Sequence, residues 1–177
     1  VFASVWKSFQ NRWAWLAVNL VTAFFASRVI GVFEGSIEKL VALAALMPIV
    51  AGIGGNSGNQ TITMIVRAVA LGQVTREHAR KLIRKEILVA LIHGLVWGGV
   101  MGLVAMLLYK DVPLGLVMIL AMTLNLVLAA AMGVLIPMTM IRFGRDPAVG
   151  SSVLITAVTD SGGFFIFLGL ATLFLVR

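Results

Sequence analysis

Residues 48–61 read Pro48-Ile-Val-Ala-Gly-Ile-Gly-Gly-Asn-Ser-Gly-Asn-Gln-Thr61, and this stretch lies inside a long apolar run. Its four glycines, two asparagines, glutamine and hydroxyl groups are unusual for a plain membrane-spanning helix. Polar groups at membrane depth are tolerated chiefly where they face protein or a water-filled cavity. The stretch therefore predicts the polar lining of a pathway inside a membrane protein.

The composition of the whole chain also indicates an integral membrane protein. Of its 177 residues, 60% are hydrophobic and 12% are charged, whereas soluble domains carry about 25% charged residues. The length allows about five spans of roughly 20 residues each, so we expect one transmembrane domain over residues 1–177. Because the chain begins at Val1, we expect it to be part of a longer protein with a soluble portion upstream. The lack of cysteine excludes disulfides, thiolate metal sites and cysteine nucleophiles.

Apolar segments separated by short polar turns predict an all-α fold with five transmembrane helices. We expect the spans at residues 12–33, 37–71, 87–109, 114–141 and 148–176. As one straight helix the second segment would be about 50 Å long, beyond a hydrocarbon core of roughly 30 Å. It must therefore tilt, bend or project into the cytoplasm, and Pro48 with the glycines of residues 52–58 is the expected site of a bend or an unwound turn.

Basic residues gather in alternate turns. They are Lys7 and Arg12 before the first span, Arg76, Arg80, Lys81, Arg84 and Lys85 between the second and third, and Arg142 and Arg145 between the fourth and fifth. Basic turns face the cytoplasm, so the pattern predicts a cytoplasmic N-terminus and a C-terminus outside. The net charge of +7 could suggest nucleic acid, but a cluster beside apolar spans favours anionic lipid headgroups at Arg76–Lys85 instead.

Asp160 is the sharpest single feature, because we find no other acidic residue well inside an expected span. A carboxylate at this depth is costly and indicates a functional site by default. Ser152, Thr156 and Asp160 recur at intervals of four and so share one helix face. The alternative is a protonated carboxyl group that ties two helices together, although the sequence offers no evident basic partner at this depth.

A second polar face follows the glycine-rich segment. Its members are Gly52, Gly55, Asn56, Asn59 and Thr63, which helical spacing brings to one side. Close packing through small residues is the alternative, but amides and hydroxyls favour a polar lining. With the carboxylate, these groups form a set of hard oxygen ligands suited to Mg²⁺, Ca²⁺ or Mn²⁺. One carboxylate per chain cannot balance a divalent ion, whereas a symmetric dimer would present two.

The remaining polar residues allow less specific interpretations. We expect His93, Asn19 and Asn125 to form hydrogen bonds that pack helices together. Glu34 and Glu38 are either ordinary interfacial carboxylates or groups that attract cations at the outer mouth. No pair of nucleophile and base and no phosphate-binding loop occurs in the sequence, so an enzyme is not expected.

Pro48, followed after five residues by Gly54-Gly55-Asn56-x-Gly58-x-Gln60, occurs together with Asp160 in the last of five expected spans. This arrangement resembles the MgtE family of magnesium channels over essentially the whole chain. The resemblance implies a homodimer in a prokaryotic inner membrane, with a pore on the dimer axis lined by the second and fifth spans. Its implied site residues are Asp160, which would bind hydrated Mg²⁺, Gly52, Gly55, Asn56, Asn59 and Thr63 on the second span, and Thr156 as a neighbour.

The family also carries cytosolic domains upstream that close the pore when Mg²⁺ is plentiful, so the resemblance implies such regulatory partners here. Some relatives act as exchangers. The alternative function is therefore a carrier that exchanges a divalent cation for Na⁺ or H⁺, since an irregular helix with polar groups at the midplane is also typical of carriers.

Overall fold

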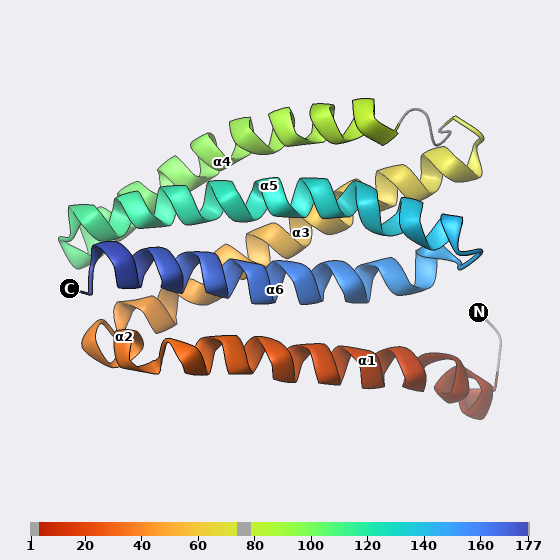
Figure 1. The fold of residues 1–177 in the computed structure, drawn as a ribbon, viewed down its shortest axis with the longest axis horizontal. Helices are drawn as coiled ribbons and strands as arrows, with labels where there is room; N and C mark the ends of the chain where they lie inside the picture. The colour runs from red at the N-terminus through yellow and green to blue at the C-terminus, as the bar shows by residue number, and fades with distance from the viewer. Residues whose placement is uncertain (1–3, 74–78, 177) are drawn as a thin grey trace.

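The structure is a computed structural model that describes residues 4–73 and 79–176. This part of the chain is built from helices and contains no strand, which confirms the all-α prediction. The helices are α1 (Val5–Val32), α2 (Glu34–Lys39), α3 (Ala42–Ala70), α4 (Ala79–Tyr109), α5 (Val112–Arg142) and α6 (Pro147–Phe174) (Figure 1).

Four of the described helices are long and apolar enough to cross a membrane. They are Val5–Val32, Arg80–Tyr109, Val112–Arg142 and Gly150–Phe174, which overlap the first, third, fourth and fifth predicted spans. The fifth long helix, α3, has 29 residues, but the glycines and amides in its middle keep it out of this group. The chain is thus an all-helical integral membrane protein in which α3 carries the polar stretch.

Helix ends follow local signals in the sequence. The side chain of Asp111 accepts a hydrogen bond from the backbone N–H of Leu114 at 3.0 Å, and Asp146 does the same for Ala148 at 2.9 Å. Each aspartate is followed within two residues by a proline, which suits the first turn of a helix because its missing N–H has no partner there. Gly144, with a φ of +65°, allows the reversal after α5.

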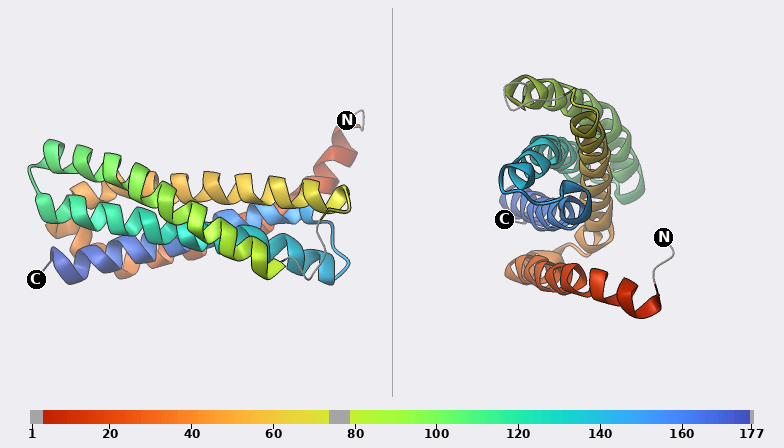
Figure 2. Two further views of the ribbon diagram at one scale, coloured as in Figure 1. Left: turned by 90° about the horizontal axis from the view of Figure 1, so that it is seen from above. Right: turned by 90° about the vertical axis from the view of Figure 1, so that its right-hand side faces the viewer.

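Helix α5 is the centre of the bundle and α4 packs closely along it. Gly94, Gly98 and Gly102 line the contact, and an added Cβ at Gly94 or Gly102 would collide with Thr123 or Ile119 of α5. Small residues let membrane helices approach closely, which explains this spacing. In the end-on view of Figure 2, α5 and α6 lie together on one side of α3.

The unwound turn that was expected at the glycines is absent, and this alternative was wrong. Helix α3 continues unbroken through Pro48 and residues 52–58, while the chain turns at Leu40 and Val41 instead. Packing of the glycines against neighbouring helices holds the helical conformation that their low propensity disfavours. The predicted tilt is present, since Figure 1 shows α3 running obliquely to α5 and α6.

The start of the third span also differs from the prediction at Ile87. Helix α4 begins at Ala79, so Arg80, Lys81, Arg84 and Lys85 occupy its first turns and are exposed, while Arg76 lies outside the described residues. Glu86 then falls near the start of a helix that is long and apolar enough to cross a membrane, and its side chain is buried. The prediction did not include this buried acidic residue, which follows the exposed Arg84 and Lys85.

Candidate cation site

The predicted site residues lie on two helices that pack against each other, α3 and α6. The glycines of α3 make their close approach possible. A Cβ added to Gly55 would lie 3.4 Å from the hydroxyl of Thr159, and one added to Gly58 would collide with Ile155. Thr159 directly precedes Asp160 in the chain, so α3 and α6 meet within one residue of the residue that carries the carboxylate.

The polar face of α3 points out of the single chain. Gly52, Asn56 and Thr63 are exposed, while Gly55 and Asn59 at the edge toward α6 are half-buried. The opposite side of α3 packs against α5 and includes the buried Gly54 and Gly58. The centre of this face is thus exposed in the part of the chain that the structure describes.

Side-chain donors on this face are used inside their own helices. The amide nitrogen of Asn59 donates to the carbonyl of Gly55 at 3.0 Å, and the hydroxyl of Thr63 donates to the carbonyl of Asn59 at 2.8 Å. On α6 the hydroxyl of Thr156 donates to the carbonyl of Ser152 at 2.9 Å. These bonds leave the amide oxygen of Asn59 and the hydroxyl lone pairs free to face a ligand, and the exposed amide of Asn56 adds a further oxygen beside its NH₂ group. The face thus offers oxygen acceptors, which suit a cation or its bound water.

Asp160 and Thr156 are half-buried on α6. No hydrogen bond or ion pair joins Asp160 to another residue in the part of the chain that the structure describes, so nothing there ties its carboxyl group to a second helix. The same part contains no group of three or more His, Asp or Glu side chains that could hold a metal ion. A single chain therefore offers one carboxylate beside neutral oxygens rather than a complete cage.

Asn125 ties three helices together, which confirms its interpretation as a helix-packing residue. This fully buried side chain on α5 donates to the carbonyl of Val50 on α3 at 2.9 Å. A Cβ at Gly54 of α3 or at Gly163 of α6 would collide with the amide. Asn125 thus sits where α3 and α6 converge on α5, close to the level of Asp160.

His93 and Asn19 differ from the expectation that they pack helices. Both side chains are exposed, and neither hydrogen-bonds to another helix among residues 4–73 and 79–176. His93 instead lines an open groove of about 360 Å³ between α3 and α4, together with Asn56 and Gln60. The groove continues the polar face of α3 toward α4.

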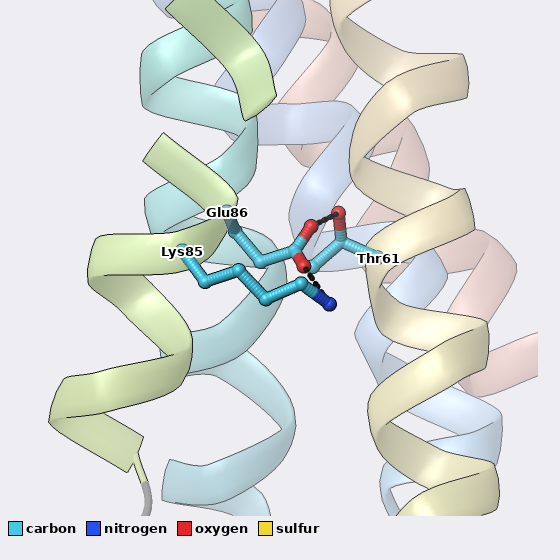
Figure 3. Close-up of polar contacts among 3 residues, drawn as sticks. All are labelled: Thr61, Lys85 and Glu86. Atoms are coloured by element: carbon cyan, nitrogen blue, oxygen red, sulfur yellow. Dashed lines mark hydrogen bonds and ion pairs between the residues drawn. The ribbon is translucent and has the colours of Figure 1, made fainter. Parts of the chain in front are cut away.

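Sequence reasoning missed the buried pair of Glu86 and Thr61. The hydroxyl of Thr61 on α3 donates to the carboxylate of Glu86 on α4 at 3.3 Å (Figure 3). Glu86 follows four nearby basic residues and lies one residue before the predicted start of the third span at Ile87. Helical spacing from His93 and Ala90 back to Glu86 was the signal that could have placed it inside the span.

The fold and these side chains define a class of protein: a helical membrane protein with an acceptor-lined face beside a carboxylate, as cation transport requires. A family model described as "MgtE: Divalent cation transporter" matches residues 47–170, and the chain belongs to this family. The resemblance noted from the sequence is thereby confirmed. The family is one of transporters rather than enzymes.

Three relatives are named magnesium transporter MgtE. The protein of Bacillus subtilis (strain 168) is 29% identical over 165 residues, which are 93% of this chain and 37% of the relative. The protein of Thermus thermophilus is 33% identical over 93% of this chain and 36% of the relative. The protein of Enterococcus faecalis is 30% identical over 96% of this chain and 37% of the relative. The chain therefore spans little more than a third of the length of these relatives.

Proposed function

We propose that this chain is the membrane domain of a magnesium channel, in which partly hydrated Mg²⁺ passes through a pore on the axis of a homodimer. One observation carries the proposal: the acceptor face of α3, beside Asp160, is exposed in the single chain. Polar groups facing lipid at this depth are unfavourable, and a second copy would turn the two faces into a shared lining. The names of the three relatives support Mg²⁺ as the ion.

The proposed topology has five crossings, one of which is α3 with its polar stretch. In support, the N-terminal ends of α1 and α4, the C-terminal end of α3 and the α5–α6 turn lie toward one end of the bundle, opposite the end of α6 (Figure 1). The basic residues of the chain concentrate at these segments, so this end faces the cytoplasm. The exposed basic start of α4 then contacts anionic headgroups of the prokaryotic inner membrane, and upstream cytosolic regulatory domains act on the same end.

The chemistry of the ion fits this arrangement. Mg²⁺ dehydrates reluctantly and usually keeps several waters while using one or two carboxylates. Two copies of Asp160 would supply the charge, and the oxygens of Gly52, Gly55, Asn56 and Asn59 would accept hydrogen bonds from the bound waters. Ca²⁺ and Mn²⁺ also prefer oxygen ligands and are therefore the competing ions to compare.

The first prediction concerns Asp160 and tests this function. Asp160→Ala should reduce Mg²⁺ flux into liposomes to background, and Asp160→Asn should weaken Mg²⁺ binding by roughly tenfold to a hundredfold, because it removes charge with little change in volume. The matched control is Asp146→Asn, which removes an exposed carboxylate while keeping a good helix cap. Wild-type flux through the Asp160→Ala variant would exclude the proposed ion path.

A carrier that couples the divalent cation to Na⁺ or H⁺ is the second candidate. The observation that favours it is Glu86, a second buried carboxylate within a membrane-crossing helix, because ionisable groups at this depth often serve proton relays. We expect flux at a fixed Mg²⁺ gradient and voltage to be insensitive to imposed Na⁺ and pH gradients. Dependence on either gradient would favour the carrier over the channel.

A further inference from the structure

Glu86 is a buried acidic residue that the proposed ion path does not use. Its side chain is only 9% exposed, and its two carboxylate oxygens have different partners. Thr61 donates to one at 3.3 Å, while the ammonium group of Lys85 lies 3.7 Å from the other (Figure 3). The Lys85 side chain is 68% exposed, so its charge is largely solvated and compensates the carboxylate weakly. A buried carboxylate is costly unless it is hydrogen-bonded, which makes the contact with Thr61 structurally important.

Thr61 lies on the lining helix but faces away from the ion path. At 3.6 residues per turn it is about 200° around α3 from both Asn59 and Thr63, nearly on the opposite side. It is buried, and Gly133 of α5 packs against it so closely that a Cβ there would lie 2.9 Å from the Cβ of Thr61. The Thr61 hydroxyl thus lies between α4 and α5, and this close packing restricts rotation of the side chain.

The bond between Glu86 and Thr61 joins α4 and α3, two helices that otherwise make little contact with each other. Helix α4 packs chiefly along α5 through its glycine face, whereas α3 packs on α5 and α6. Within the described residues, this is the one side-chain hydrogen bond between α4 and α3. Rotation of α3 about its own axis would break it.

A second hydrogen bond between helices holds α3 at the other end of its glycine-rich segment, and we call this bond and that between Glu86 and Thr61 the two ties. Asn125 of α5 holds the carbonyl of Val50, about three turns from Thr61 along α3. Gly52, Gly55, Asn56 and Asn59 lie between the two ties, in a glycine-rich segment with low intrinsic stiffness. The two ties therefore bracket the lining and set the direction in which its oxygens point.

We propose that Glu86 is a positioning residue that fixes the rotation of α3 through Thr61 and so sets the width of the cation site formed with Asp160. This inference rests on the proposed function. Discrimination between Mg²⁺ and the larger Ca²⁺ depends on cavity size and rigidity, and Ca²⁺ tolerates the more flexible geometry. Loss of the tie should therefore change which ion is favoured, rather than abolish ion binding at Asp160.

The test compares Mg²⁺ and Ca²⁺ flux into liposomes for variants of the tie. The double variant Thr61→Val with Glu86→Leu removes both partners and leaves no buried polar group unpaired, so we expect it to fold. Its ratio of Mg²⁺ to Ca²⁺ flux should fall by roughly threefold to tenfold. Glu86→Gln and Thr61→Ser each keep the hydrogen bond and should retain the wild-type ratio.

Thr123→Val is the matched control, because it removes a part-buried hydroxyl that bonds only within its own helix. It should leave the ratio unchanged. A wild-type ratio of Mg²⁺ to Ca²⁺ flux in the double variant would overturn the positioning role. An equal fall of this ratio in Glu86→Gln would also overturn it, because the charge of Glu86 rather than its hydrogen bond to Thr61 would then set the selectivity. Absence of Mg²⁺ flux in the wild-type chain would instead overturn the proposed function together with this inference.

Discussion

At the scale of single residues, the glycines of α3 are not equivalent. Gly58 lies where α3 meets α6, and the space for its missing side chain is filled by Ile155. Gly52 faces open space on the exposed side of the same helix. Close approach of α3 to α6 therefore requires glycine at position 58. The glycine at position 52 instead leaves a backbone carbonyl accessible beside the proposed ion path.

A substitution at Gly58 should measure this difference. Gly58→Ala should lower the free energy of unfolding in detergent by about 1–3 kcal/mol, because the new methyl group forces Ile155 or the helix to move. Gly99→Ala is the control: no atom lies within 4 Å of the added Cβ in the middle of α4, so a small gain of about 0.5–1 kcal/mol is expected from helix propensity. Equal effects on thermal unfolding at the two positions would contradict the packing argument.

At the scale of secondary structure elements, α5 organises the domain by holding α3, α4 and α6 around it. Its contact with α4 is made by glycines, and its contact with α3 and α6 includes the buried amide of Asn125. A polar group in a membrane interior has few alternative partners, so such a bond orients helices as well as stabilising them. The lining helix α3 is thus held from α5 at Val50 and from α4 at Thr61.

The contribution of Asn125 can be tested by truncation. Asn125→Ala should destabilise the domain by about 1–3 kcal/mol, since it removes the bond to Val50 and leaves a gap between Gly54 and Gly163. Asn19→Ala should change stability by less than about 0.5 kcal/mol, because that side chain is exposed. Thermal unfolding of both variants provides the comparison. A larger loss of stability for Asn19→Ala than for Asn125→Ala would contradict the role of Asn125 in packing the helices.

At the scale of the whole molecule, the proposed function makes a single chain an incomplete transporter. Its acceptor face lies on the outside of the bundle, and a single chain presents one carboxylate there. Two copies related by symmetry would enclose this face and double the charge.

Cross-linking tests the proposed assembly, because the chain contains no native cysteine. Under oxidising conditions in membranes, Asn56→Cys should form a disulfide-linked dimer, since the two copies of this face meet at the proposed axis. Leu107→Cys, on the exposed outer side of α4, should remain monomeric on gels run without reductant. The reverse pattern would place the interface elsewhere on the bundle.

Much of the fold was predictable because membrane helices depend on length and apolar character. The apolar runs located α5, α6 and the end of α1 closely, although α1 begins at Val5 and not at residue 12. The oxygen-bearing residues from Gly52 to Thr63 and at Asp160 were predicted from helical spacing. Boundaries were less predictable. The basic residues before Glu86 masked the early start of α4, and the glycines suggested an unwound turn that packing against α5 and α6 prevents.

The amino-acid sequence by itself determined that this chain is a helical membrane protein, where its acceptor groups lie along α3, and that it resembles the MgtE family. Those properties follow from composition and from helical spacing, which are local. Only the tertiary structure decided that α3 stays helical, that its acceptor face opens outward beside Asp160, and that Glu86 reaches Thr61. These depend on which helices pack together and at what rotation, and such contacts join residues that are far apart in the chain.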